Sequence, residues 1–145
     1  MSDSALLLYR KAYLALKYHP DGSNRPLIEA LSACLEKHGW KTFCVFRDLE
    51  HWGQTAFDPP ELMRLSLRAI EASDLVVVEL SEKGVGVGIE AGYAYARQIP
   101  VITLARRGAD ISDTLRGISA AVLAYGDLAE VEAFLAEFKE TKNGA

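Results

Sequence analysis

The chain has 145 residues, of which half are hydrophobic and a quarter are charged, and its formal net charge is -4. This length fits one domain, residues 1–145, that is large enough to bury its own core. The acidic balance argues against a nucleic-acid partner, because such a partner requires a basic patch. Arg10, Lys11 and Lys17 interrupt the apolar stretch near the N-terminus, so we expect no membrane-spanning segment there.

The two cysteines, Cys34 and Cys44, both lie in apolar stretches, and neither belongs to a metal-binding spacing such as C-x-x-C. We therefore expect two reduced thiols in a cytoplasmic protein. No cluster of metal-ligand residues occurs, so neither a metal nor another cofactor is predicted.

Strand-like and helix-like segments alternate along the chain. Strands are predicted over residues 11–18, 41–47, 74–80, 100–106 and 120–125. Helices are predicted over residues 25–38, 60–73, 88–98 and 127–140, with a short helical turn at 110–119. This alternation predicts an α/β, flavodoxin/Rossmann-like three-layer sandwich, in which a five-stranded, mostly parallel sheet is covered on both faces by helices. Ligands of such folds bind at the carboxyl ends of the strands.

The loop after the first strand, LKYHPDGSNR, concentrates polar side chains at that edge. One interpretation is a solvated loop in which Asn24 caps the next helix. The alternative is an anion site, in which Asn24, Arg25 and the N–H groups of the helix bind a phosphate while Lys17 or His19 adds charge. His19 is also a candidate proton donor, because an imidazole titrates near neutral pH.

The loop after the second strand, FRDLEHWGQ, carries two further candidates. Asp48 lies at the carboxyl end of the predicted strand, where a carboxyl group can exchange protons with a ligand. Trp52 either stacks on a nucleobase or packs against its own domain.

The turn GVGVGIEAGYA is the most distinctive stretch of the sequence. Its glycines, Gly84, Gly86 and Gly88, either only ease the passage from strand to helix or leave room for a substrate ring. Glu90 either complements the helix dipole or is a carboxylate that attacks an anomeric carbon, kept ionised by the helix N-terminus. Tyr93 shares the helical face of Glu90 and is expected either to orient it or to pack in the core.

From about Ala69 to Gly126 the sequence resembles the nucleoside 2-deoxyribosyltransferase superfamily, above all its 2'-deoxynucleoside 5'-phosphate N-hydrolase branch, which shares the run G-V-G-x-E-x-G. The resemblance implies that Glu90 is the catalytic nucleophile and that Gly86 and Gly88 line the sugar pocket. It also implies that Ser112, in DTLRGIS, binds the 5'-phosphate in the site of a neighbouring subunit, so that the active unit is a homodimer.

Two positions depart from the pattern of these relatives. Ser66 stands where the family usually carries an aspartate that assists the leaving base, and a serine hydroxyl does not serve as a carboxylic acid. Asp48 is the preferred substitute for this aspartate, and His19 is the other candidate for the missing proton donor. Gly84 stands where the hydrolases carry a phosphate-binding serine and the transferases an aspartate.

Three functions remain open at this point. The first is cleavage of the N-glycosidic bond of a nucleoside or nucleoside 5'-monophosphate, by hydrolysis or base transfer, with Glu90 as the nucleophile. The second is a nucleotide-binding or sensor module without turnover, which the residues at 66 and 84 favour. The third, by analogy of fold, is an NAD-glycohydrolase-type domain.

Overall fold

A computed structural model describes residues 10–138 of the chain. Five strands form one sheet in the order β2-β1-β3-β4-β5, and every neighbouring pair is parallel. The strands are β1 (Arg10–Leu16), β2 (Trp40–Phe43), β3 (Leu75–Glu79), β4 (Val101–Arg106) and β5 (Ala121–Tyr125). The predicted five-stranded α/β sandwich is therefore confirmed, with a sheet that is parallel throughout.

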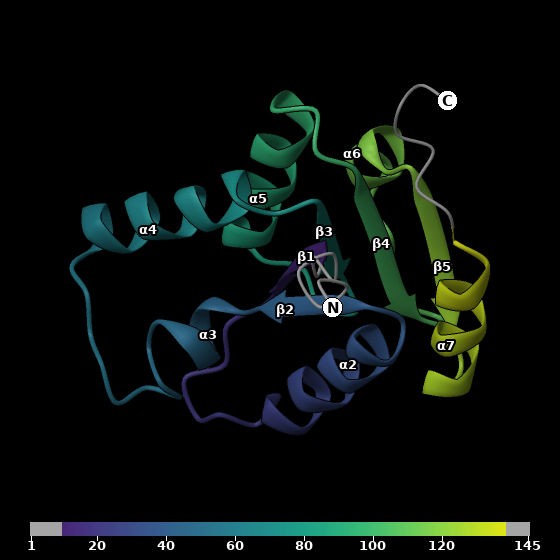
Figure 1. Ribbon diagram of the computed structural model, residues 1–145, viewed down its shortest axis with the longest axis horizontal. Coiled ribbons are helices and arrows are strands. Elements are labelled where there is room, and N and C mark those ends of the chain that lie inside the picture. The colour runs from purple at the N-terminus through teal and green to yellow at the C-terminus, as the bar shows by residue number, and fades with distance from the viewer. Residues whose placement is uncertain (1–9, 139–145) are drawn as a thin grey trace, which may run out of the picture.

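Helices cover both faces of this sheet (Figure 1). They are α2 (Arg25–Lys37), α3 (Val45–Asp48), α4 (Pro59–Glu71), α5 (Val85–Ala96), α6 (Asp113–Ile118) and α7 (Leu128–Glu137). The helices α4, α5 and α6 pack on one face, and α2 and α7 pack on the other. The described part of the chain thus forms the three layers expected for strands that are joined by helices.

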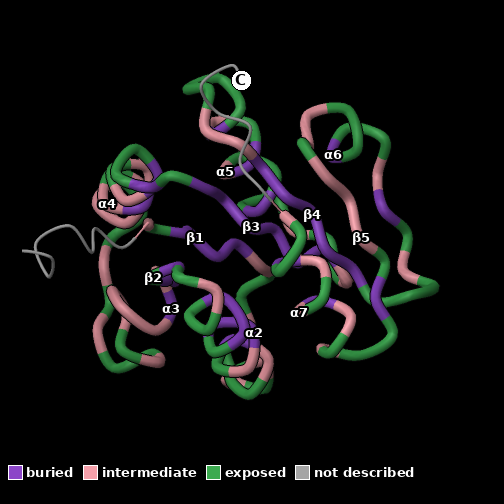
Figure 2. Tube along the Cα trace, turned by 45° about the vertical axis from the view of Figure 1, so that its right-hand side comes forward, coloured by how far each residue is buried: buried purple, intermediate pink, exposed green. Residues whose placement is uncertain are grey.

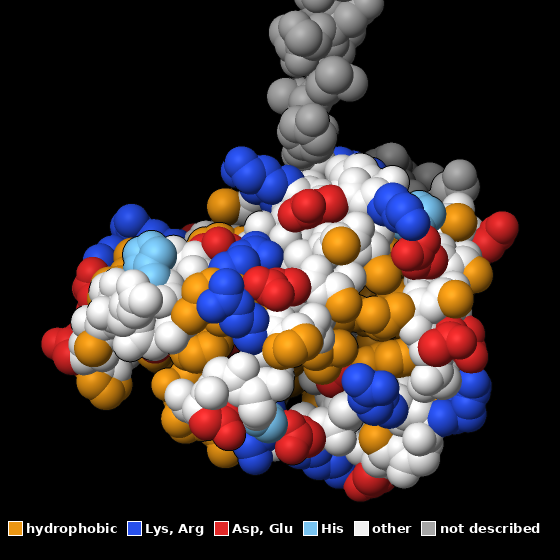
Figure 3. All heavy atoms as spheres, turned by 90° about the horizontal axis from the view of Figure 1, so that it is seen from below, with side chains coloured by type: hydrophobic (Ala, Val, Ile, Leu, Met, Phe, Trp, Pro, Cys, Tyr) orange, Lys and Arg blue, Asp and Glu red, His pale blue; other side chains and the backbone are white. Residues whose placement is uncertain are grey.

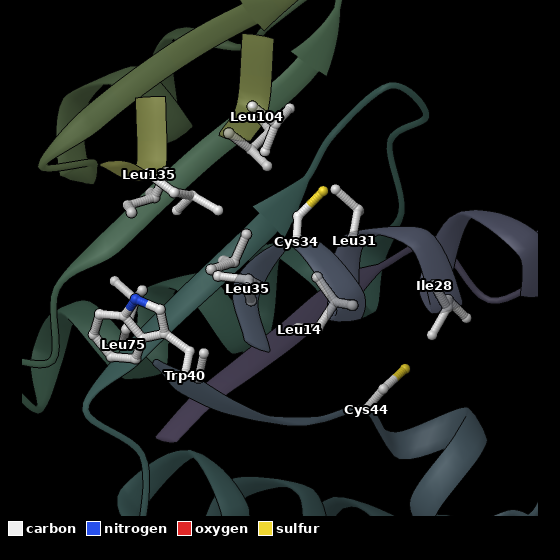
Figure 4. Packing of buried hydrophobic residues seen from close by; sticks show 14 of the residues in the cluster. Leu14, Ile28, Leu31, Cys34, Leu35, Trp40, Cys44, Leu75, Leu104 and Leu135 are labelled. Carbon is white, nitrogen blue, oxygen red and sulfur yellow. The ribbon is translucent and has the colours of Figure 1, made fainter. Parts of the chain in front are cut away.

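Each face of the sheet has its own hydrophobic core, because side chains alternate along a strand. In β1, Leu14 faces the core that α2 and α7 close, together with Ile28 and Leu31 of α2 (Figure 4). The next side chain back, Tyr13, faces the opposite core, under α4 and α5. The central strand β3 is buried along its whole length, as a strand covered on both faces must be (Figure 2).

The second strand ends earlier than the sequence predicts. Residues 41–47 were expected to be extended, but β2 stops at Phe43 and the chain turns into α3. The Asp48 carboxylate accepts a hydrogen bond from the Cys44 backbone N–H at 2.9 Å, and the Asp48 N–H donates to the Cys44 carbonyl at 2.7 Å. These two bonds close a helical turn at the end of an edge strand that has a neighbour on one side only.

Helix α5 begins three residues earlier than predicted. Gly84 is its extended N-cap residue, and the helix runs from Val85. The backbone N–H of Gly88 already donates to the Gly84 carbonyl at 3.3 Å. Gly86 and Gly88 are therefore helical residues, and Glu90 lies in the second turn of α5.

The strand order places a topological switch point between β1 and β3. From β1 the chain passes to β2 on one side of the sheet, and the later strands build outward on the other side. Ligand sites in open parallel sheets lie at such points, beyond the carboxyl ends of the strands. The segments that meet here are the end of β1, the start of α3 and the start of α5.

Two further sequence predictions concern the thiols and the surface. Cys34 and Cys44 are both free and buried, as expected. Among residues 10–138, no helix is both long enough and apolar enough to cross a membrane. On the face shown in Figure 3, basic and acidic side chains are interspersed over the described surface.

Candidate active site

A cavity of about 440 Å³ opens at the switch point. The end of β1 and the start of α3 form one side, and α4 and the first turns of α5 form the other. Its lining comprises Tyr13, Leu14, Ala15, Leu16, Lys17, Tyr18, Asn24, Ile28, Cys44, Val45, Phe46, Glu50, Leu62, Met63, Ser66, Gly84, Val85, Gly86, Val87 and Glu90. Six of the residues singled out in the sequence are thereby brought together: Glu90, Lys17, Asn24, Ser66, Gly84 and Gly86.

Within the cavity lining, a hydrogen bond joins two elements that are remote in sequence. Glu90, in the second turn of α5, accepts a hydrogen bond from the hydroxyl of Tyr13 with an O–O distance of 2.6 Å. Tyr13 is fully buried, and its position in β1 directs the ring toward α5. A buried phenol that reaches a single carboxylate oxygen fixes the orientation of that carboxyl group and leaves its other oxygen free.

The electrostatics of Glu90 differ from the sequence-based expectation. Removal of the carboxyl group from water raises its pKa from 4.5 to about 7, and the Tyr13 hydrogen bond lowers the value only in part. Glu90 is therefore only partly ionised at neutral pH, whereas the sequence predicted that the helix N-terminus keeps it ionised. The reason is the burial of the carboxyl group, which outweighs the helix dipole in the second turn because that dipole acts mainly within the first turn.

The same contact acts on the tyrosine. Burial and the neighbouring Glu90 carboxylate raise the pKa of Tyr13 far above its ordinary value. Tyr13 therefore remains a neutral donor at any physiological pH. Its hydroxyl group donates a hydrogen bond that stabilises the ionised form of Glu90.

At the rim of the cavity, Lys17 lies against the N-terminus of α5. Its stem passes beside Gly84, where a Cβ atom would stand 3.6 Å from the Lys17 Cγ. Among the described residues the ammonium group of Lys17 has no ion-pair partner, and no side chain caps α5. A lysine and a set of free backbone N–H groups therefore share this corner of the cavity.

Asn24 reaches the cavity instead of capping its helix. It occupies the N-cap position of α2, but no side-chain cap bond forms there, and its Nδ2 donates to the Lys17 carbonyl at 2.8 Å. Its buried Oδ1 has no hydrogen-bond partner among the described residues. An unsatisfied amide oxygen is an available acceptor for a bound group.

Ser66 lies on α4 in the lining and is almost completely buried. Its hydroxyl donates to the carbonyl of Leu62 one turn earlier, at 2.8 Å. Position 66 therefore presents a hydroxyl group and no acid to this cavity.

Two of the predicted acid or base candidates lie outside the lining. The Asp48 carboxylate is held by the Arg47 guanidinium at 2.8 and 2.9 Å, in addition to its bond with the Cys44 N–H. The His19 ring lies between Ser23, at 2.8 Å, and Glu82. Both side chains are thus held by other contacts, Asp48 within its own segment and His19 partly by Glu82 in the segment after β3.

Two of the predicted binding candidates also serve packing. The guanidinium of Arg25 lies 4.2 Å from the centroid of the Trp52 ring and pairs with Glu29. Trp52 in turn packs edge-on against Phe46, with ring centroids 5.5 Å apart. Of the two interpretations of Trp52, packing within its own domain is the one observed.

The remaining predicted residues are placed elsewhere. Gly88 lies outside the lining of the cavity. The Tyr93 hydroxyl donates to the Glu71 carboxylate on α4, so Tyr93 does not orient Glu90. Ser112 is the N-cap of α6 and accepts from the Leu115 N–H, outside the lining of the cavity.

Sequence reasoning assigned no role to three polar residues of the lining, Tyr13, Tyr18 and Glu50. Tyr13 is a polar aromatic in an otherwise apolar strand, but the sequence does not distinguish it from a core tyrosine. Glu50 lies in the loop after α3, among the polar residues of FRDLEHWGQ, but the sequence assigned the candidate roles in that loop to Asp48 and Trp52. Among residues 10–138, no group of three or more His, Cys, Asp or Glu side chains is arranged to hold a metal ion.

Comparison with known proteins gives this cavity its context. No family model matches the sequence. A protein of Thermofilum pendens named "Putative 2'-deoxynucleoside 5'-phosphate N-hydrolase 1" is 30% identical over 131 residues, which cover 83% of this chain and 88% of the relative. The chain belongs to the 2'-deoxynucleoside 5'-phosphate N-hydrolase family. A protein of the same name from Syntrophotalea carbinolica is 46% identical over 41 residues, 28% of this chain and 29% of the relative.

Solved structures of low identity share the fold of this family member. The CMP N-glycosidase BcmB of Clostridium botulinum aligns with a TM-score of 0.66 at 22% identity, over 89% of this chain and 100% of that one. The 2-deoxyribosyltransferase of Bacillus psychrosaccharolyticus aligns with a TM-score of 0.65 at 20% identity, over 86% and 95%. These structures support the architecture, and the roles of individual residues are argued from the site itself.

Proposed function

We propose that this protein cleaves the N-glycosidic bond of a nucleoside 5'-monophosphate, with Glu90 as the nucleophile. The observation that carries the proposal is the half-buried Glu90 carboxyl group in the cavity, held at 2.6 Å by Tyr13. The family membership supports the same reaction, since its relatives are named for hydrolysis of 2'-deoxynucleoside 5'-phosphates.

The reaction proceeds in two displacements. A Glu90 oxygen attacks C1' of the sugar, the bond from C1' to the base nitrogen breaks with its electrons on the base, and the base takes up a proton. A water molecule then attacks C1', the ester to Glu90 breaks, and the sugar phosphate is released. Hydrolysis is proposed over transfer to a second base because the family is named for hydrolysis.

The phosphate is assigned to the corner formed by Lys17 and the start of α5. The lysine supplies a positive charge, and the first backbone N–H groups of α5 point outward without an intrahelical partner. Gly84, the N-cap residue of α5, lies beside the Lys17 stem, with the site of a Cβ atom 3.6 Å from the Lys17 Cγ. Lys17 thus offers the phosphate a contact in place of the serine that the hydrolases carry at position 84.

A homodimer is part of the proposal. Val85 and Ile89, one turn apart on α5, are 82% and 49% exposed, and the described chain does not cover them. A second copy packed on this face of α5 removes that apolar surface from water. Ser112 of the partner subunit then completes the phosphate site. Sedimentation or light scattering tests the homodimer through its molecular mass.

The two free, buried thiols fit a cytoplasmic location.

Base release tests the proposed reaction directly. The protein is incubated with the common ribo- and deoxyribonucleoside 5'-monophosphates, the corresponding nucleosides and NAD, and the products are separated by chromatography. We expect free base from at least one monophosphate, no release by Glu90→Gln, and unchanged release by Glu61→Gln, whose carboxyl group is paired with Arg64 outside the cavity.

The second candidate function is a nucleotide-binding module without turnover. Ser66 favours it, because the family's acid is missing from the cavity lining. Tight binding of a nucleotide by calorimetry with recovery of the intact ligand would establish this alternative and overturn cleavage. Cleavage of NAD without release of base from any nucleotide or nucleoside would instead indicate an NAD-glycohydrolase-type domain.

A further inference from the structure

The cleavage proposed above leaves one requirement unmet. The departing base carries the electrons of the broken bond, and a neutral nucleobase leaves poorly unless a proton reaches one of its nitrogens. Proton transfer from a positioned acid accelerates such a step by about 10²–10⁴-fold. Ser66 does not supply this proton, because its hydroxyl is a weak acid that already donates to Leu62.

The other titratable groups of the lining are poorly suited to the task. Tyr13 donates to Glu90, and its pKa is raised. Burial raises the pKa of the Cys44 thiol to about 11. Lys17 lies beside Gly84, in the corner assigned above to the phosphate, and Tyr18 is 52% exposed and packs edge-on against Phe46. The lining contains one carboxyl group besides the nucleophile, and it belongs to Glu50.

We propose that Glu50 is the general acid that protonates the leaving base, in place of the carboxyl group absent at position 66. In the first displacement the protonated Glu50 gives its proton to the base nitrogen as the C1'–N bond breaks. In the second, the Glu50 carboxylate takes a proton from the water that attacks C1', which restores both carboxyl groups. The assignment rests on the proposed function, and it goes beyond it by naming the second reacting residue.

The backbone around Glu50 is held rigidly. Its N–H donates to the Val45 carbonyl at 3.0 Å, and its own carbonyl accepts from the N–H groups of Gly53 and Thr55, each at 2.9 Å. The three following residues have left-handed φ angles, 48° at His51, 58° at Trp52 and 94° at Gly53. Two consecutive non-glycine residues in that region are costly and persist only where the surrounding contacts impose them.

An aromatic contact fixes the same loop. Trp52 packs edge-on against Phe46 of α3 and lies under the Arg25 guanidinium. The tight loop therefore presents Glu50 from a fixed support, as a proton donor that must meet a leaving group requires.

The surroundings of the Glu50 side chain favour its protonated form. The carboxyl group is half-buried and shares the lining with the apolar side chains of Phe46, Leu62 and Met63. Among residues 10–138 it has no hydrogen-bond or ion-pair partner, in contrast to Asp48, which Arg47 holds as a carboxylate. Burial raises the pKa of Glu50. Both features shift the Glu50 carboxyl group toward the protonated form that a general acid requires.

The test compares leaving groups that differ in their need for a proton. Glu50→Gln is assayed on the best substrate and on the same nucleotide methylated at a ring nitrogen (N7 of a purine or N3 of cytosine), whose cationic base leaves without protonation. We expect kcat to fall by about 10²–10⁴-fold on the first substrate and by less than about tenfold on the second. Retained turnover of the methylated substrate also shows that the variant is folded.

A second measurement does not depend on the base. In Glu50→Ala, formate fits the space of the missing carboxyl group and should restore part of the lost rate, while the matched variant Glu61→Gln should need no such rescue. Glu50→Gln within about fivefold of the wild type would overturn the assignment, and so would an equal loss on both substrates without rescue by formate. An inactive wild-type protein would instead refute the proposed function and this role with it.

Discussion

Replacing Glu90 by glutamine should stabilise the protein while it abolishes turnover. In the unfolded chain the carboxyl group titrates at 4.5, and in the folded protein at about 7, because burial disfavours its charge. Between these values the folded state keeps a proton that the unfolded state has lost, so the free energy of unfolding decreases as the pH rises. At about 1.4 kcal/mol per pKa unit, the ionised Glu90 costs about 3 kcal/mol above pH 7.

Glutamine has a similar shape, accepts the Tyr13 hydrogen bond and carries no charge at any pH. We therefore expect Glu90→Gln to exceed the wild type by up to about 3 kcal/mol in urea unfolding at pH 8.5, which for this chain length corresponds to about 10 °C in Tm. At pH 4.5 the two proteins should differ much less. Glu29→Gln, a change of the same kind at an exposed pair with Arg25, should stay within about 0.5 kcal/mol at both pH values. An equal gain at both pH values, or none at pH 8.5, would refute the desolvation argument.

Three other predictions concern the cavity. Tyr13→Phe removes the hydrogen bond that lowers the pKa of Glu90. The rising limb of the pH profile of kcat/KM should therefore move from near 7 to higher pH. An unmoved limb would show that this hydrogen bond does not control the ionisation of Glu90. Lys17→Met should lower kcat/KM for a monophosphate about tenfold or more and leave that for the corresponding nucleoside nearly unchanged, and equal losses on both would contradict a phosphate contact. Gly86→Ala should lower kcat/KM, because Gly86 lines the cavity and the added methyl group occupies part of it, whereas Gly88→Ala, outside the lining, should leave kcat/KM unchanged. Because alanine favours a helix more than glycine does, both variants should raise the free energy of unfolding by about 1 kcal/mol, measured by thermal unfolding.

The architecture was predictable because it depends on patterns that are local in sequence. The valine run at residues 76–78 and the alternation of strands with amphipathic helices specify a covered parallel sheet. Element boundaries were less predictable where one contact decides them. The bond from the Cys44 N–H to the Asp48 carboxylate turns the end of the second strand into a helix, and no periodicity in the sequence records that bond.

The candidate site was predictable only in part, for a physical reason. Glu90 was identified because its glycine-rich surroundings are contiguous in sequence. Its partner Tyr13 is 77 residues away, and only the register of β1 against β3 brings the two together. Asp48 was expected at the ligand edge because it follows a strand, but an adjacent arginine binds its charge, whereas Glu50, two residues further on, reaches the cavity lining.

The central claim is that Glu90 becomes covalently bonded to the sugar during turnover. A 2'-fluoro-2'-deoxynucleoside 5'-monophosphate slows both displacements through the electron-withdrawing fluorine, and the slowed intermediate is measured by mass spectrometry of the intact protein and of its peptides. The mechanism predicts a mass increase of one fluorinated sugar phosphate, located on the peptide that contains Glu90 and absent from Glu90→Gln. Base release by the wild type without such an adduct, or with an adduct on another residue, would contradict it.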